Sequence, residues 1–185
     1  MSVLQLPTCP TDCTGSNEAV SFNECAGEFH YGEISKLYVA RSDAADFVSP
    51  DLIAEWTARL SDTGTDPDDI RTLVGIGELP EPEQTELPVS GNRIIYSAKT
   101  YNLLFEVDET NDTNYEYMLA TYCNVKKKVW IEMSDGMLYG GKTGIEMVFK
   151  GSQPLLKGRK DVLKIIFKGK WESATDPLRC ISPMF

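Results

Sequence analysis

The chain has 185 residues, of which 42% are apolar and 10% aromatic, a composition typical of a globular protein with one well-buried core. No apolar run approaches membrane-spanning length, and residues 1–6 have neither the positive charge nor the long apolar stretch of a secretory signal. We therefore expect a soluble protein that is made in the cytoplasm and has no membrane partner.

The net charge of −10 is unevenly distributed along the chain. Residues 126–170 contain eleven lysines and arginines against four acidic residues, a net charge of +7, which leaves −17 for the rest. Solvated surfaces alone can produce such a split. It also suits self-association, in which an acidic surface of one copy meets a basic surface of the next and sets the register. An acidic surface would further suit a channel through which DNA slides without binding.

Residues 1–32 form a cysteine-rich segment with little regular pattern. Cys9, Cys13, Cys25 and His30 have the spacing C-x3-C-x11-C-x4-H, and thiolates with an imidazole are ligands that zinc prefers in closed structural sites. Reduced structural thiols, or a disulfide between Cys9 or Cys13 and Cys25, are the alternatives, and reduced thiols are the usual state in a cytoplasmic protein. The sequence thus leaves open a zinc site, reduced thiols or a disulfide in this segment, and predicts no other cofactor.

The next segment predicts a strand followed by a helix. Alternating apolar residues favour a strand over Gly32–Ala40. Ser49 and Pro50 are typical of a helix start, with Ser49 as the cap. Trp56 is interpreted as a core anchor. The expected apolar stripe of this helix comprises Leu52, Ile53, Trp56 and Leu60.

Residues 62–91 are the candidate arm. Leu79–Pro88 contains three prolines, which forbid a helix and disfavour an inner strand, whereas Ile70–Ile76 is apolar enough for a short strand. Loops of this length are usually functional or disordered. We expect an extended arm that docks on another subunit, with simple mobility as the alternative.

The second half of the chain reads as strands around one helix. Alternation of apolar and polar residues predicts strands at Tyr101–Val107, at Lys128–Met133, from Ile145 to Phe149, and at Leu163–Trp171, where Ile166 interrupts the polar face. A helix is expected over Thr113–Cys123, capped by Asp112 or Thr113. The predicted fold is mainly β (α+β), a β-sandwich or small barrel-like sheet spanning 33–172 with one or two flanking helices. Residues 173–185 form a short tail whose apolar end is expected to pack against a neighbour.

One string matches a phosphate-binding motif. Gly136–Thr143 satisfies G-x-x-x-x-G-K-T, in which Lys142 would contact phosphate and Thr143 would bind magnesium. That chemistry needs a helix to begin at Lys142. The following residues alternate as a strand does, so we interpret the string as a glycine-rich turn between strands.

The other residues that could be catalytic or bind nucleic acid do not form a recognisable motif. His30 is the single histidine, and no serine occupies a nucleophile elbow. Lys126–Lys128 is interpreted as a solvated sheet edge, where lysines discourage aberrant pairing. We therefore predict no catalytic residues and no enzymatic activity.

The order of elements from 101 to 171 resembles that of tail tube and neck ring proteins of long-tailed bacteriophages. It is carried by the strand Tyr101–Val107, the helix, the strand Lys128–Met133, the glycine turn from Leu138 to Ile145 and the final strand closing at Trp171. The resemblance implies a virion protein made in the host cytoplasm that assembles with itself, as hexamers, and with other virion proteins around a DNA conduit. It makes Leu79–Pro88 the candidate stacking loop. The alternatives are another virion component such as a capsid or baseplate accessory protein, a zinc-stapled binding module, or a nucleotide enzyme that uses Lys142.

Overall fold

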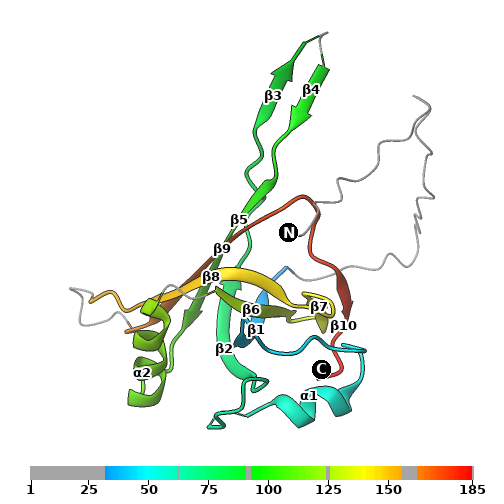
Figure 1. Cartoon of the computed structure of the whole chain (residues 1–185). Helices are drawn as coiled ribbons and strands as arrows, with labels where there is room; N and C mark the ends of the chain where they lie inside the picture. The colour runs from blue at the N-terminus through cyan, green and yellow to red at the C-terminus, as the bar shows by residue number, and fades with distance from the viewer. Residues whose placement is uncertain (1–31, 62, 91–92, 124–125, 156–161, 185) are drawn as a thin grey trace, which may run out of the picture. The chain divides into compact units, whose positions relative to one another are not determined.

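The computed structural model describes residues 32–61, 63–90, 93–123, 126–155 and 162–184, all within the compact unit Tyr31–Phe185 (Figure 1). The elements in chain order are β1 (Ile34–Arg41), α1 (Ile53–Arg59), β2 (Arg71–Glu78), β3 (Glu86–Val89), β4 (Arg93–Tyr96), β5 (Lys99–Val107), α2 (Asp112–Ala120), the 3-10 turn η1 (Thr121–Cys123), β6 (Lys126–Met133), β7 (Met137–Tyr139), β8 (Ile145–Ser152), β9 (Ile165–Ser173) and β10 (Arg179–Ile181).

Six antiparallel strands close into a barrel. They follow the order β1-β2-β5-β9-β8-β6, and β6 pairs again with β1, from Ile34 opposite Met133 to Arg41 opposite Lys127. Closure gives each of these six strands a partner on both sides, whereas β7 and β10 extend the sheet from β6 and leave β10 as its edge. The predicted mainly β fold with flanking helices is confirmed, and the barrel-like sheet is the architecture that forms.

Alternating side chains fill the barrel interior. Every second residue of β5, β8 and β9 is buried there, as the sequence alternation predicts. A bulge between Ile34 and Lys36 shifts the register of β1 by one residue, so Ile34 and Leu37 face the same side despite their odd spacing. The interior contains Ile34, Leu37, Val39, Leu73, Tyr101, Leu103, Phe105, Val107, Met118, Val129, Ile131, Ile145, Met147, Phe149, Ile165, Phe167 and Trp171.

A second apolar cluster packs outside the barrel, under α1. The ring of Trp56 is fully buried, stacks on Phe47 at 4.4 Å between centroids and meets Trp130 of β6 edge-on at 5.6 Å. The prediction that Trp56 anchors the core is therefore confirmed. The predicted start at Ser49 and Pro50 is wrong, because the Glu55 carboxylate instead accepts hydrogen bonds from the Val48 and Ser49 amides and the helix begins at Ile53.

Helix α2 connects β5 to β6 and contacts β8 and β9. Its cap is Asn111 rather than Asp112 or Thr113, because the Asn111 side chain accepts a hydrogen bond from the Asn114 amide at 2.8 Å. Met118 points into the barrel interior. Thr121 then accepts a hydrogen bond from the Gly151 amide at 2.7 Å, which attaches the end of the helix to β8.

The predicted arm 62–91 divides into two parts. Its apolar piece forms β2, a barrel strand, which confirms the short strand expected there. Its end forms β3, which pairs with β4 as a separate two-stranded hairpin inserted between β2 and β5. Figure 1 shows this hairpin leading away from the barrel strands. The docking of the arm on another subunit stays a prediction.

The C-terminal tail packs on its own chain. Strand β10 pairs with β7, and Cys180 and Met184 pack against the cluster around Trp56. The expectation that the apolar end requires a neighbouring subunit is therefore wrong for Met184, whereas Phe185 lies outside the described residues.

Replacing Trp56 tests the role of the outer cluster. Trp56→Ala removes a fully buried indole and should lower the free energy of unfolding by about 3–5 kcal/mol. Ile53→Ala, on the exposed side of the same helix, should change it by less than about 1 kcal/mol. Urea unfolding followed by circular dichroism measures both, and equal losses would show that α1 does not anchor the outer face of the barrel.

Candidate functional site

The glycine-rich string forms a turn packed on Trp130, as predicted from its sequence. Gly140 and Gly144 have φ values of 133° and 70°, and a Cβ at Gly140 would lie 2.6 Å from the Trp130 ring. The Trp130 indole N–H donates to the Gly141 carbonyl at 2.9 Å, and the Lys142 carbonyl accepts from the Phe47 amide at 2.8 Å. The chain then enters β8 rather than a helix. The phosphate-loop hypothesis is therefore wrong, because no helix N-terminus faces the loop.

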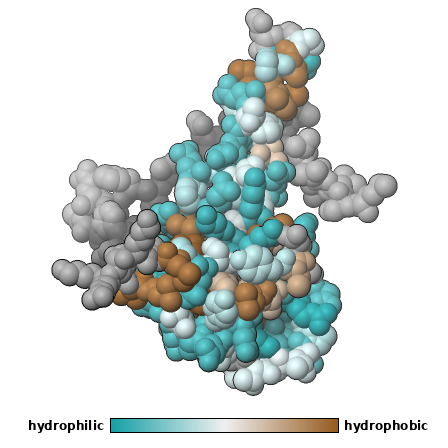
Figure 2. All heavy atoms as spheres, turned by 90° about the vertical axis from the view of Figure 1, so that its left-hand side faces the viewer, coloured by the Kyte–Doolittle hydropathy of each residue, from teal (hydrophilic) through white to brown (hydrophobic). Residues whose placement is uncertain are grey.

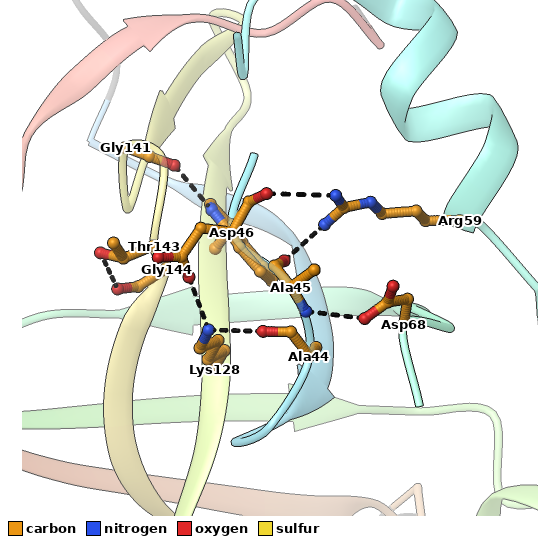
Figure 3. Close-up of polar contacts among 10 residues, drawn as sticks. Ala44, Ala45, Asp46, Arg59, Asp68, Lys128, Gly141, Thr143 and Gly144 are labelled. Atoms are coloured by element: carbon orange, nitrogen blue, oxygen red, sulfur yellow. Dashed lines mark hydrogen bonds and ion pairs between the residues drawn. The ribbon is translucent and has the colours of Figure 1, made fainter. Parts of the chain in front are cut away.

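The lysine cluster Lys126–Lys128 lies on an interior strand. Because β6 pairs with β1 on one side and with β8 on the other, the prediction of a solvated sheet edge is wrong. The Lys128 ammonium donates to the Ala44 carbonyl and to the Asp46 carboxylate, both at 2.6 Å (Figure 3). From the other side, the Arg59 guanidinium donates to the Ala45 carbonyl at 2.6 Å. These contacts hold the loop that places Phe47 on Trp56.

Glu132 is a buried carboxylate with a complete set of partners. It is 1% exposed on the outer side of β6 and accepts hydrogen bonds from Lys36 at 2.7 Å, Tyr38 at 3.0 Å and Ser182 at 2.5 Å. Burial raises the pKa of Tyr38, and the negative charge of Glu132 raises it further. The network joins β1, β6 and the C-terminal tail. Its groups are satisfied within the described chain, so its role is structural.

Removing the Glu132 carboxylate should have a large effect on stability. Glu132→Ala leaves buried donors without an acceptor, so we expect the free energy of unfolding to fall by about 3 kcal/mol. Glu146→Ala removes an exposed ion pair with Lys126 and should change it by less than about 1 kcal/mol. Chemical denaturation measures both, and a loss below 1 kcal/mol for Glu132→Ala would contradict the structural role.

The β3–β4 hairpin exposes apolar side chains on both of its faces. Leu87 lies opposite Ile95 on one face, and Pro88 lies opposite Ile94 on the other, next to Tyr96. Leu87, Ile94, Ile95 and Tyr96 are between 49% and 56% exposed. Figure 2 shows this apolar surface gathered at the top of the molecule. The two strands pair with each other and with no barrel strand among the described residues.

Sequence reasoning placed β3 in the arm but missed β4. The available signal was a Gly-Asn dipeptide at 91–92 between the apolar triplets Leu87–Val89 and Ile94–Tyr96, which is typical of a β-hairpin. The prolines of the arm obscured it. Pro88 is tolerated because β3 is an edge strand, where one amide needs no partner.

The predicted zinc ligands Cys9, Cys13, Cys25 and His30 lie outside the described residues. Within residues 32–184, as far as they are described, no group of three or more His, Cys, Asp or Glu side chains could hold a metal ion. The zinc site therefore stays a prediction about the N-terminal segment alone.

No protein-family model matches the chain, and no curated protein matches its sequence. Among the helices that the structure describes, none has the length and hydropathy to span a bilayer. Among the described residues, the β3–β4 hairpin exposes four large apolar side chains on one two-stranded element, and it is the candidate site.

Proposed function

We propose that the protein is a virion structural protein, a ring or tube subunit of a phage tail or neck that assembles with itself around a DNA conduit. The observation that carries this proposal is the β3–β4 hairpin, which exposes apolar side chains on both faces. The resemblance of residues 101–171 to tail tube and neck ring proteins supports the virion role.

An uncovered hairpin of this kind needs a partner. A two-stranded hairpin by itself is marginally stable in water, and exposed apolar patches mark interaction sites. The partner we propose is a second copy of the chain, as the resemblance to ring-forming tail proteins implies. Every copy would then present the same hairpin to its neighbour. Such a head-to-tail interface forms a ring when its rotation closes, and stacked rings form a tube.

The closed barrel restricts how subunits join. The barrel completes its sheet within one chain, because β6 pairs with β1, so neighbouring copies are not needed to close it. Among the described strands, β3, β4 and the short β10 each have a strand partner on one side only, so their main-chain edges are available to a neighbour. Addition of a strand to such an edge is a common mode of recognition between chains.

The alternatives have less support in the described residues. A nucleotide enzyme would need the phosphate loop that the Gly136–Thr143 turn does not form. A zinc-stapled binding module depends on residues outside the description. A capsid or baseplate accessory protein would also use an exposed apolar hairpin to bind a neighbour. Images of the assembly would distinguish these roles, because each assembly has a different shape.

Assembly of the purified chain tests the proposal directly. Negative-stain microscopy and light scattering should show rings or tubes of the wild-type protein. Ile94→Lys/Ile95→Lys places a charge on each face of the hairpin and should weaken association on the order of 100-fold, because burying two isoleucines contributes about 3 kcal/mol.

The matched control is Val48→Lys/Ile53→Lys, which replaces two exposed apolar side chains near α1 and adds the same charge. This control should assemble like the wild type, and both variants should keep the wild-type circular dichroism spectrum. A wild-type chain that stays monomeric at high concentration, or a hairpin variant that assembles as well as the control, would reject the proposal.

A further inference from the structure

Three lysines lie on the outer face of the barrel and have no acidic partner in the part of the chain that the structure describes. Lys168 on β9 is directly opposite Lys150 on β8, and Lys170 is opposite Val148. All three lysines are exposed, and none forms an ion pair within the described residues. Like charges directly opposite each other destabilise a sheet, so this face would gain from an anionic group supplied from outside.

The same lysines border a groove with an apolar floor. Its volume is about 650 Å³, and Leu104, Tyr122 and Val148 line it together with Lys150, Lys168 and Lys170. Pro80 of the same chain forms part of its border. We call this surface the lysine groove. A ligand that matches it combines negative charge with apolar groups.

The segment that leads into the hairpin has this combination. Glu78, Glu81, Glu83 and Glu86 are all exposed and form no ion pair within the described residues. No basic residue interrupts residues 78–92, and Pro80 and Pro82 lie between the glutamates. Leu79 packs against the interior cluster of its own barrel and anchors the start of the segment. We call residues 78–86 the acidic stem.

The acidic stem is held in an extended form before any partner arrives. Glu83 and Thr100 exchange two backbone hydrogen bonds, of 2.9 and 2.8 Å, which fix the stem beside the start of β5. Pro80 and Pro82 restrict the backbone on either side of Glu81. An extended segment that is already ordered loses little conformational freedom on binding.

We propose that the lysine groove of one copy binds the acidic stem of a second copy. The proposal rests on the self-assembly proposed above and names the two surfaces that meet. This contact would bring together, between subunits, the two oppositely charged parts of the sequence: residues 126–170 carry a net charge of +7, and the rest carries −17. A nucleic acid is the less favoured occupant, because the rest of the chain would repel phosphates and the apolar floor of the groove matches the proline of the Glu81–Glu83 segment better.

Charge exchange tests this pairing. Lys150→Glu/Lys168→Glu and Glu81→Lys/Glu83→Lys should each weaken association at least about 10-fold, because each places like charges across the contact. An equimolar mixture of the two variants should assemble again, since the stem of each then meets a groove of opposite charge. Sedimentation velocity and electron microscopy measure the outcome, and circular dichroism confirms that these exposed substitutions leave the fold intact.

The control variant is Lys142→Glu/Arg179→Glu, which changes the net charge by the same amount as the groove variant. Both positions are exposed and lie outside the groove, so this variant should assemble normally. If the groove and stem variants assemble like the wild type while the hairpin variant does not, the inference fails and the proposed function stands. A wild-type monomer rejects both. A mixture of the two variants that does not assemble also rejects the inference. If the wild type binds a labelled DNA duplex and the groove variant does not, the lysines bind a polyanion instead.

Discussion

The pairing of β1 with β6 is the interaction on which the rest of the structure depends. It turns a six-stranded sheet into a closed barrel and decides which side chains of β6 face inward. Val129 and Ile131 enter the interior, whereas Trp130 and Glu132 face outward. A shift of one residue in this register would exchange the two sets and bury a carboxylate among the aromatic rings of the interior.

The outward side of β6 then organises a second layer. Trp130 packs with Trp56 and supports the glycine turn, and Glu132 joins β1 to the C-terminal tail. Lys128 holds the loop that precedes α1 (Figure 3). The lysine-rich run and the glycine-lysine motif suggest binding or catalysis when they are read along the chain. In the folded protein, these residues serve packing instead.

Closure of the barrel also limits the surfaces that the proposed assembly can use. A barrel that pairs its own strands offers few main-chain edges, so the proposed contact with other copies uses the β3–β4 hairpin and side chains of the outer face. The hairpin provides apolar surface, which contributes affinity. The acidic stem and the lysine groove provide opposite charges, which set orientation and register. The proposed assembly divides these two tasks between neighbouring parts of the chain.

The sequence by itself determined the strands β5, β6, β8 and β9, because their side chains alternate with a period of two. It also identified Trp56 as a core anchor and the glycine string as a turn. It could not determine that Glu55 and Asn111 would set the helix starts, since several neighbouring polar residues compete for the same amides. Nor could it place Lys126–Lys128 on an interior strand. Only the tertiary structure decided between sandwich and barrel, because the pairing of β1 with β6 joins residues more than 80 positions apart, and no local pattern records such a partner.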